Sequence, residues 1–138
     1  MSNFVLGFVV DPESKMVALL RKRKPDKWAG LFNGIAGTVK EGETNIAAMV
    51  RKCEEECGVI TTETEWVPRC EMSTPDGPVH VFIRIGNVFA LHQCEDEPVL
   101  YLSLLSNWTR EPVVPSLKWL LPLVLDFSIK NIPGVVCE

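Results

Sequence analysis

The segment RKCEEECG, residues 51–58, is the part of the chain whose residue types most clearly suggest chemistry. On a helix, side chains three and four positions apart share a face, so Lys52, Glu55 and Glu56 point roughly the same way. Two neighbouring carboxylates on one face are costly unless a cation neutralises them. Carboxylate oxygens are hard ligands that suit Mg²⁺ or Mn²⁺, so this face is a candidate metal site.

Two ordinary interpretations compete with a metal site in this segment. A run of glutamates on a helix is most often a solvated face. Cys53 and Cys57 could form a zinc or redox pair, but they fall on the apolar stripe of the expected helix, which favours packing in the core. The two histidines of the chain are distant in sequence from both cysteines.

The residues around the segment predict a helix over 45–57. Thr44 is a suitable N-cap residue, and Gly58 stands where a left-handed residue commonly ends a helix. The apolar residues between them recur at helical spacing and form a single stripe. The helix should therefore bury one face and present the carboxylates on another.

The rest of the chain alternates apolar stretches with turn sequences. We expect strands within 4–10, 16–24, 64–72, 79–91 and 99–105. For 99–105 a short helix is the alternative. A C-terminal helix is expected within 117–127. The sequence STPDGP, residues 73–78, has the composition of a hairpin turn. This order predicts an α+β or sandwiched layout with a mixed sheet between helices.

Length and composition limit the class of protein. A chain of 138 residues suits one domain, so residues 1–138 are expected to form a single unit. The net charge of −4 argues against a nucleic-acid polymer as the partner. Five cysteines without framework spacing, and no recognisable signal peptide or membrane span, predict a cytoplasmic protein that does not bind a membrane.

Residues upstream of the helix extend the carboxylate segment into a longer pattern. Gly37, five residues, Glu43, seven residues, Arg51 and then KCEEECGV resemble the Nudix box. In that pattern the arginine is followed by glutamate, an apolar residue, any residue, two glutamates, any residue, glycine and an apolar residue. The chain departs from it at Lys52, where many members have a glutamate that binds metal or acts as the general base.

The resemblance implies a fold and a reaction. The fold is a Nudix-type α/β/α sandwich with a mixed central sheet, in the α/β class. The reaction is an attack by water on a diphosphate linked to another moiety, dependent on Mg²⁺ or Mn²⁺. Glu55, Glu56 and the Gly37 carbonyl would be the metal ligands, while Glu43 and Arg51 would orient the loop and the helix.

The resemblance leaves the general base open, because Lys52 stands at the position of the usual glutamate. Glu54 is one replacement. The acidic loop Glu95, Asp96 and Glu97 is another, since some family members recruit a carboxylate from that later loop, and Glu97 is our candidate within it.

The approach to the box also suggests a substrate class. WAGLFNGIAGTVKEGET, residues 28–44, looks like the corresponding stretch of the MutT-like subgroup that hydrolyses purine nucleoside triphosphates. Asn33 matches an asparagine that contacts the base there, whereas Ala36 replaces a usual glycine. The Trp-Pro-Asp-Asp stretch with which vertebrate members read oxidised purines is missing before the last helix, where the chain has VVPS.

The remaining substrate-binding candidates offer positive charge for phosphates or an aromatic face for a base: Arg23, Lys40, Phe32 and Trp119. The basic run 21–24 could equally be a charged strand end, and aromatic residues more often pack in a core.

Three functions remain after these observations. The leading one is hydrolysis of a (d)NTP to the NMP and pyrophosphate, as in nucleotide-pool sanitation, by a monomer or homodimer. A second is hydrolysis of another nucleoside diphosphate derivative, such as ADP-ribose or a dinucleotide. The third, from another class, is a catalytically weak nucleotide-binding module in which Lys52 has replaced the base.

Overall fold

The central strand of the protein is β1, Phe4–Asp11, whose apolar residues are buried along almost its whole length. The computed structural model describes residues 2–137. β1 pairs in parallel with β6, Gly77–Ile85, and antiparallel with β2, Met16–Arg21, and β4, Ile35–Thr38. A strand covered on both faces carries a continuous apolar run, which explains the sequence FVLGFVV.

Four further strands complete a mixed sheet of eight. β5, Trp66–Thr74, forms the predicted hairpin with β6, and β8, Val135–Val136, pairs in parallel with β5. On the other side of the sheet, β3, Phe32–Asn33, and β7, Val99–Ser103, both pair with β2. The stretch 99–105 therefore contributes a strand rather than the alternative helix.

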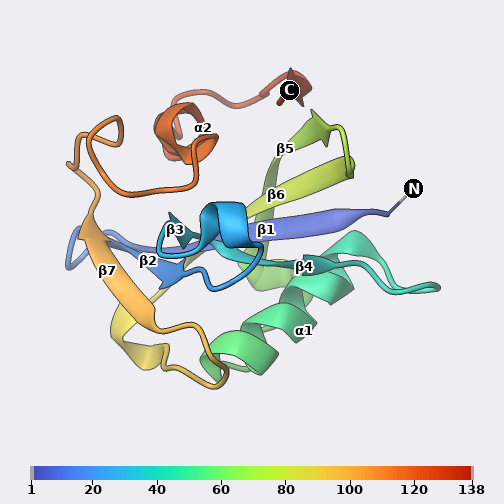
Figure 1. Cartoon of the computed structure of the whole chain (residues 1–138), viewed down its shortest axis with the longest axis horizontal. Coiled ribbons are helices and arrows are strands. Elements are labelled where there is room, and N and C mark those ends of the chain that lie inside the picture. The colour runs from blue at the N-terminus through green and yellow to red at the C-terminus, as the bar shows by residue number, and fades with distance from the viewer. Residues whose placement is uncertain (1, 138) are drawn as a thin grey trace.

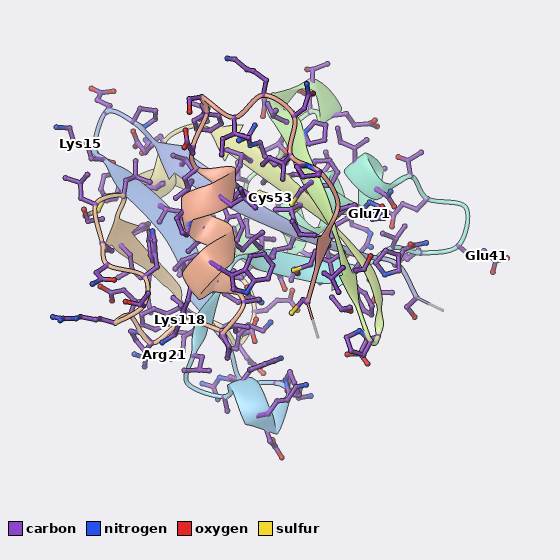
Figure 2. The ribbon with its side chains drawn as sticks, turned by 90° about the horizontal axis from the view of Figure 1, so that it is seen from above. Lys15, Arg21, Glu41, Cys53, Glu71 and Lys118 are labelled. Carbon is purple, nitrogen blue, oxygen red and sulfur yellow. The ribbon has the colours of Figure 1, made fainter. Side chains whose placement is uncertain are left out.

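Two helices cover opposite faces of this sheet (Figure 1). α1, Asn45–Cys57, packs on a buried cluster that includes Met49 and Cys53, and α2, Leu117–Val124, packs on a second cluster. Figure 2 looks onto α2 lying across its face of the sheet. The α/β/α sandwich predicted from the sequence is confirmed. Short 3-10 turns lie at Asp26–Trp28, Glu63–Glu65 and Val88–Ala90.

Within residues 2–137, no helix has the length and apolar character needed to cross a membrane.

Three strands are shorter than the sequence pattern predicts, and β7 is one of them, since it ends at Ser103. β2 ends at Arg21, because the basic residues that follow leave the sheet and the backbone amide of Lys22 bonds instead to the Leu31 carbonyl. β6 ends at Ile85, where the Gly86 amide still bonds to the end of β1. The chain then enters a 3-10 turn, in which the Val88 amide donates to the Asp11 side chain and the Phe89 amide donates to the Asn87 side chain.

The two ends of α1 match the expectation from sequence and connect the helix to a distant loop. The Thr44 hydroxyl accepts a hydrogen bond from the Ala47 amide at 3.2 Å, and Gly58 is left-handed with φ of 72°. The last carbonyls of the helix are satisfied across the chain: His92 donates its amide to Cys57, and Cys94 donates to Glu56. These bonds place residues 92–97 against the C-terminal half of α1.

Gly58 should tolerate a side chain far less well than Gly42, and this difference tests how the loop is held. Both glycines have positive φ, but a Cβ on Gly42 would meet nothing within 4 Å, whereas one on Gly58 would collide with the His92 ring. We expect Gly42→Ala to cost about 1–2 kcal/mol of unfolding free energy. Gly58→Ala should cost more, because the ring must also move.

Urea denaturation of both variants measures the two costs. A Gly58→Ala variant that is no less stable than Gly42→Ala would show that the contact between His92 and the helix end carries no strain.

Candidate active site

Arg51 connects the loop before α1 to the helix through several hydrogen bonds. Its guanidinium donates from Nε to Glu43 at 2.8 Å, from Nη2 to the other Glu43 oxygen at 3.0 Å, and from Nη2 to the Thr38 carbonyl at 2.9 Å. It also reaches Glu55 from Nη1 at 3.3 Å. Two parallel bonds to one carboxylate form a strong, directional pair. The loop, the end of β4 and the helix are thus tied to one side chain.

The Glu43 carboxylate is held in its ionised form by these bonds. The hydrogen bond from Arg51, joined by one from the Lys40 backbone amide, lowers the pKa of Glu43 to about 2. The same contacts raise the pKa of Arg51 above its usual value. The structure therefore brings together Glu43 and Arg51, as the spacing predicts, and their proposed orienting role remains a prediction.

Glu56 is the buried carboxylate of the segment. It is only 8% exposed, and burial raises its pKa to about 7 even though Lys52 and Lys22 act in the opposite direction. Its Oε1 lies 3.6 Å from the Lys52 ammonium. Its Oε2 is buried and has no hydrogen-bond partner among residues 2–137. A buried carboxylate oxygen without a partner is unfavourable, so this atom is the clearest candidate for an external ligand.

Lys52 lies between the two carboxylates that the sequence assigns to a metal. Its Nζ is 3.3 Å from Glu55 Oε2 as well as 3.6 Å from Glu56 Oε1. Its stem passes directly over Gly37, where an added Cβ would come within 2.5 Å of Lys52 Cδ and Cε. The missing side chain of Gly37 is therefore used here to make room for the lysine.

A cleft of about 400 Å³ opens beside Glu56. One wall is the acidic loop, Glu95, Asp96 and Glu97, and the other carries Arg23 and Lys24. Since Glu95 and Glu97 both raise the pKa of Glu56, three carboxylates share this small region. The cleft combines oxygen donors for a cation with positive side chains for phosphates.

Glu97 ties the two walls of the cleft together. One of its oxygens is 3.0 Å from Lys22 Nζ, and the other accepts the Arg23 backbone amide at 2.9 Å. Arg23 Nε donates in turn to the Asp96 carbonyl at 2.8 Å. Sequence reasoning missed the role of Lys22, because its partner is 75 residues away and no local spacing reports it.

The larger cavity of the molecule, about 670 Å³, offers less chemistry. It lies at the far ends of β1 and β6 and is lined by Asp11 and Phe89, among others. The Asp11 carboxylate there already accepts three backbone amides, from Glu13, Ser14 and Val88. We therefore take the smaller cleft as the candidate active site.

The donor set of the cleft fits a hard divalent cation. The free Glu56 oxygen and the nearby Glu95 carboxylate supply oxygen ligands of the kind that Mg²⁺ and Mn²⁺ prefer. Among residues 2–137, no three acidic, histidine or cysteine side chains already converge on one point. This agrees with the position of Lys52, whose ammonium lies beside both Glu55 and Glu56.

The other predicted substrate-binding residues are distributed over two layers. Pairing with Leu20 places Asn33 on the face covered by α1, where its side chain accepts the Gly34 amide. Phe32 is buried in the cluster beneath α2, with the Arg21 guanidinium 5.6 Å from its ring centre. Trp119 is 40% exposed on α2. Phe32 and Trp119 therefore lie in the α2 layer rather than beside Glu56, and their roles remain predictions.

The two cysteines of the box segment pack in the hydrophobic core. Cys53 and Cys57 are fully buried and unpaired, and burial raises the pKa of the Cys53 thiol to about 11. The prediction of core packing is confirmed.

The raised pKa of Glu56 predicts how metal-free stability depends on pH. The native carboxyl binds its proton more tightly than the unfolded one, so stability should fall as pH rises from about 4.5 to about 7 and then level off. The loss should reach up to about 3 kcal/mol. Glu43 has a lowered pKa, and its contribution changes below this window.

Chemical denaturation in the presence of a chelator, repeated across this pH range, measures how the free energy of unfolding depends on pH. Glu56→Gln should lose the dependence, while the matched control Glu54→Gln, an exposed glutamate on the same helix, should keep it. An unchanged slope in Glu56→Gln would contradict a buried, ionising Glu56.

The comparison with known proteins agrees with this geometry. The NUDIX domain pattern matches residues 4–115. No curated protein sequence matches the chain significantly. A NUDIX-family hydrolase from Clostridium perfringens is 14% identical, with a TM-score of 0.73 over 91% of this chain and 97% of that one.

Two MutT proteins are similarly close in structure. The Bacillus halodurans protein is 18% identical, with a TM-score of 0.70 over 91% of this chain and 83% of its own. The Methanosarcina mazei protein is 17% identical, with a TM-score of 0.69 over 94% and 96%. At these identities the likeness shows the fold alone, and the domain match shows the family. The chain belongs to the Nudix family of hydrolases.

Proposed function

We propose that this protein is a divalent-cation-dependent pyrophosphohydrolase that splits a nucleoside triphosphate, a (d)NTP, into the NMP and pyrophosphate. Nudix hydrolases act on small nucleoside diphosphate derivatives and generally use divalent cations. The finer statement, a triphosphate and Mg²⁺ or Mn²⁺, follows the resemblance of residues 28–44 to the MutT-like subgroup. Nucleotide-pool sanitation is the corresponding cellular role.

The observation that carries the proposal is the buried, unpartnered oxygen of Glu56 at the edge of a cleft with basic side chains. Diphosphate hydrolysis requires a cation next to the phosphate and positive charge around it, because both screen the negative charge that repels an attacking nucleophile. The free oxygen can take the cation, and Arg23 and Lys24 lie across the same cleft for the phosphates.

The other residues divide into ligands and positioning residues. Glu55 and the Gly37 carbonyl join Glu56 as proposed metal ligands. The pair of Glu43 and Arg51 is proposed to hold the loop and α1 at a fixed separation. A bound divalent ion would polarise the phosphate and lower the pKa of a water molecule.

The candidates for the general base differ in whether their carboxylates are already hydrogen-bonded. Glu97 has both oxygens engaged by the Lys22 side chain and the Arg23 amide, so it must be released before it can take a proton. Glu95 is close enough to Glu56 to raise its pKa, and no hydrogen bond or ion pair involves its carboxylate among residues 2–137. We therefore favour Glu95 over Glu97, and Glu54 remains the third candidate.

The proposed substrate contacts divide by chemistry. Arg23 and Lys40 are the candidates for phosphates, whereas Asn33, Phe32 and Trp119 are the candidates for the base. The single unit 1–138 is proposed to act on free nucleotides rather than on a nucleic-acid polymer, as a cytoplasmic monomer or homodimer without membrane association.

One observation favours a second candidate function, a nucleotide-binding module with weak activity. Lys52 already contacts both carboxylates that would bind the metal, so part of their negative charge is compensated before any ion binds. In this case the wild type should bind nucleotides but release pyrophosphate slowly, and Lys52→Glu should increase the rate.

Chromatographic separation of the products from a panel of triphosphates, ADP-ribose and a dinucleotide tests these functions. A triphosphate gives the NMP and pyrophosphate, ADP-ribose gives AMP and ribose 5-phosphate, and a dinucleotide gives two nucleotides. With Mg²⁺ or Mn²⁺, wild type should hydrolyse at least one triphosphate, and a chelator should abolish the activity. Glu56→Gln should reduce kcat by at least about 100-fold, because one cation ligand is lost. Glu54→Gln should retain most of the rate if Glu95 or Glu97 is the base, and should lose it if Glu54 is the base.

Variants of the acidic loop then identify the base. Glu95→Gln should lower kcat more than Glu97→Gln does. Full activity in Glu56→Gln, or preference for ADP-ribose over every triphosphate, would contradict the proposal.

A further inference from the structure

Lys52 is the residue at which the box segment differs most from the family pattern, and its contacts are specific. Its ammonium bridges Glu55 and Glu56, at 3.3 Å and 3.6 Å. Its side chain is 17% exposed, so the charge is held largely inside the site rather than in solvent. A freely solvated lysine would not make two such contacts at once.

The path of the side chain shows that the site is shaped around it. The stem lies over the bare backbone of Gly37, which leaves room for methylene groups and for no further carbon atom. The ammonium is thereby delivered to the space between the two carboxylates. Because the stem is packed, moving the charge away would also expose apolar surface.

Counting formal charges around Lys52 gives the consequence. Three carboxylates, Glu43, Glu55 and Glu56, face two cations, Arg51 and Lys52, and one negative charge remains. A glutamate at position 52, as in the family pattern, would leave three negative charges on the same groups.

The other charged residues at the cleft do not change this balance. They are the three carboxylates of the acidic loop 95–97, the lining cations Arg23 and Lys24, and Lys22, which pairs with Glu97. These charges cancel formally. One uncompensated negative charge can be neutralised by one divalent ion, whereas three would need two.

We propose that Lys52 is a built-in cation that takes the place of one divalent ion, so that the protein binds one ion fewer than it would with glutamate at this position. The proposal rests on the cation-dependent function above and adds how its charge requirement is met. The remaining ion binds at the unpartnered Oε2 of Glu56, the only oxygen of the bridged pair that is buried without a partner among residues 2–137. Lys52 thus sets the number of ions and does not contact the reacting atoms.

Titration of the metal-free protein with Mn²⁺, without nucleotide, measures the number of bound ions directly. Wild type, Lys52→Glu and Lys52→Met are compared by calorimetry and by the paramagnetic signal of free Mn²⁺. Lys130→Glu, an exposed residue outside the cleft, is the matched control for a charge change of the same size. Lys52→Met keeps the packed stem over Gly37 and removes only the charge.

We expect Lys52→Glu to bind one more Mn²⁺ than wild type, and Lys130→Glu to bind the same number as wild type. Lys52→Met should bind its first ion at least about tenfold more tightly, because one more carboxylate charge is left uncompensated. Its melting temperature should fall in a chelator and rise with Mn²⁺, and the rise should be larger than that of wild type, because its first ion binds more tightly.

Equal stoichiometry in wild type and Lys52→Glu, or unchanged affinity in Lys52→Met, overturns the proposal. If Lys52→Glu does not fold, Lys52→Met decides alone. The titration contains no substrate, so it tests only the number and affinity of bound ions. The proposed function is tested independently, by the hydrolysis assays on wild type and Glu56→Gln.

Discussion

The burial of the Glu56 carboxylate is the constraint on which the site depends. A charged oxygen that is removed from water must find a partner, give up its charge, or bind an ion. Here Lys52 lies beside one oxygen, and no group among residues 2–137 hydrogen-bonds to the other. The position of Glu56 follows from the helix, since residues 53 and 57 beside it belong to the core. The fold therefore forces a carboxylate into a poorly solvated place, where either a proton or a cation must compensate its charge.

The surrounding structure holds that place open from three directions. Arg51 fixes the loop and the end of β4 relative to α1 through Glu43 and Thr38. The amides of His92 and Cys94 hold the acidic loop against the end of the helix. The β-sheet provides the apolar surface on which α1 packs. Together these contacts leave a cleft between an acidic and a basic wall.

Sequence alone predicted the helix and its box well, because cap, apolar stripe and left-handed glycine are all local signals at fixed spacing. Strand lengths were overestimated where charge or glycine followed, since pairing partners decide where a strand ends. The pairing of Lys22 with Glu97 and the packing of His92 on Gly58 could not be predicted, because each joins residues far apart in sequence. The aromatic candidates were chosen by type alone, and register placed Phe32 under α2.

The position of a divalent ion is the most direct test of the central claim. A crystal structure with Mn²⁺ and a non-hydrolysable nucleoside triphosphate, solved with anomalous data, would locate both. The geometry predicts an ion bound to Glu56 in the cleft, the phosphates facing Arg23 and Lys24, and the Lys52 ammonium still between Glu55 and Glu56. An ion bound elsewhere, or Lys52 displaced by a second ion, would contradict it.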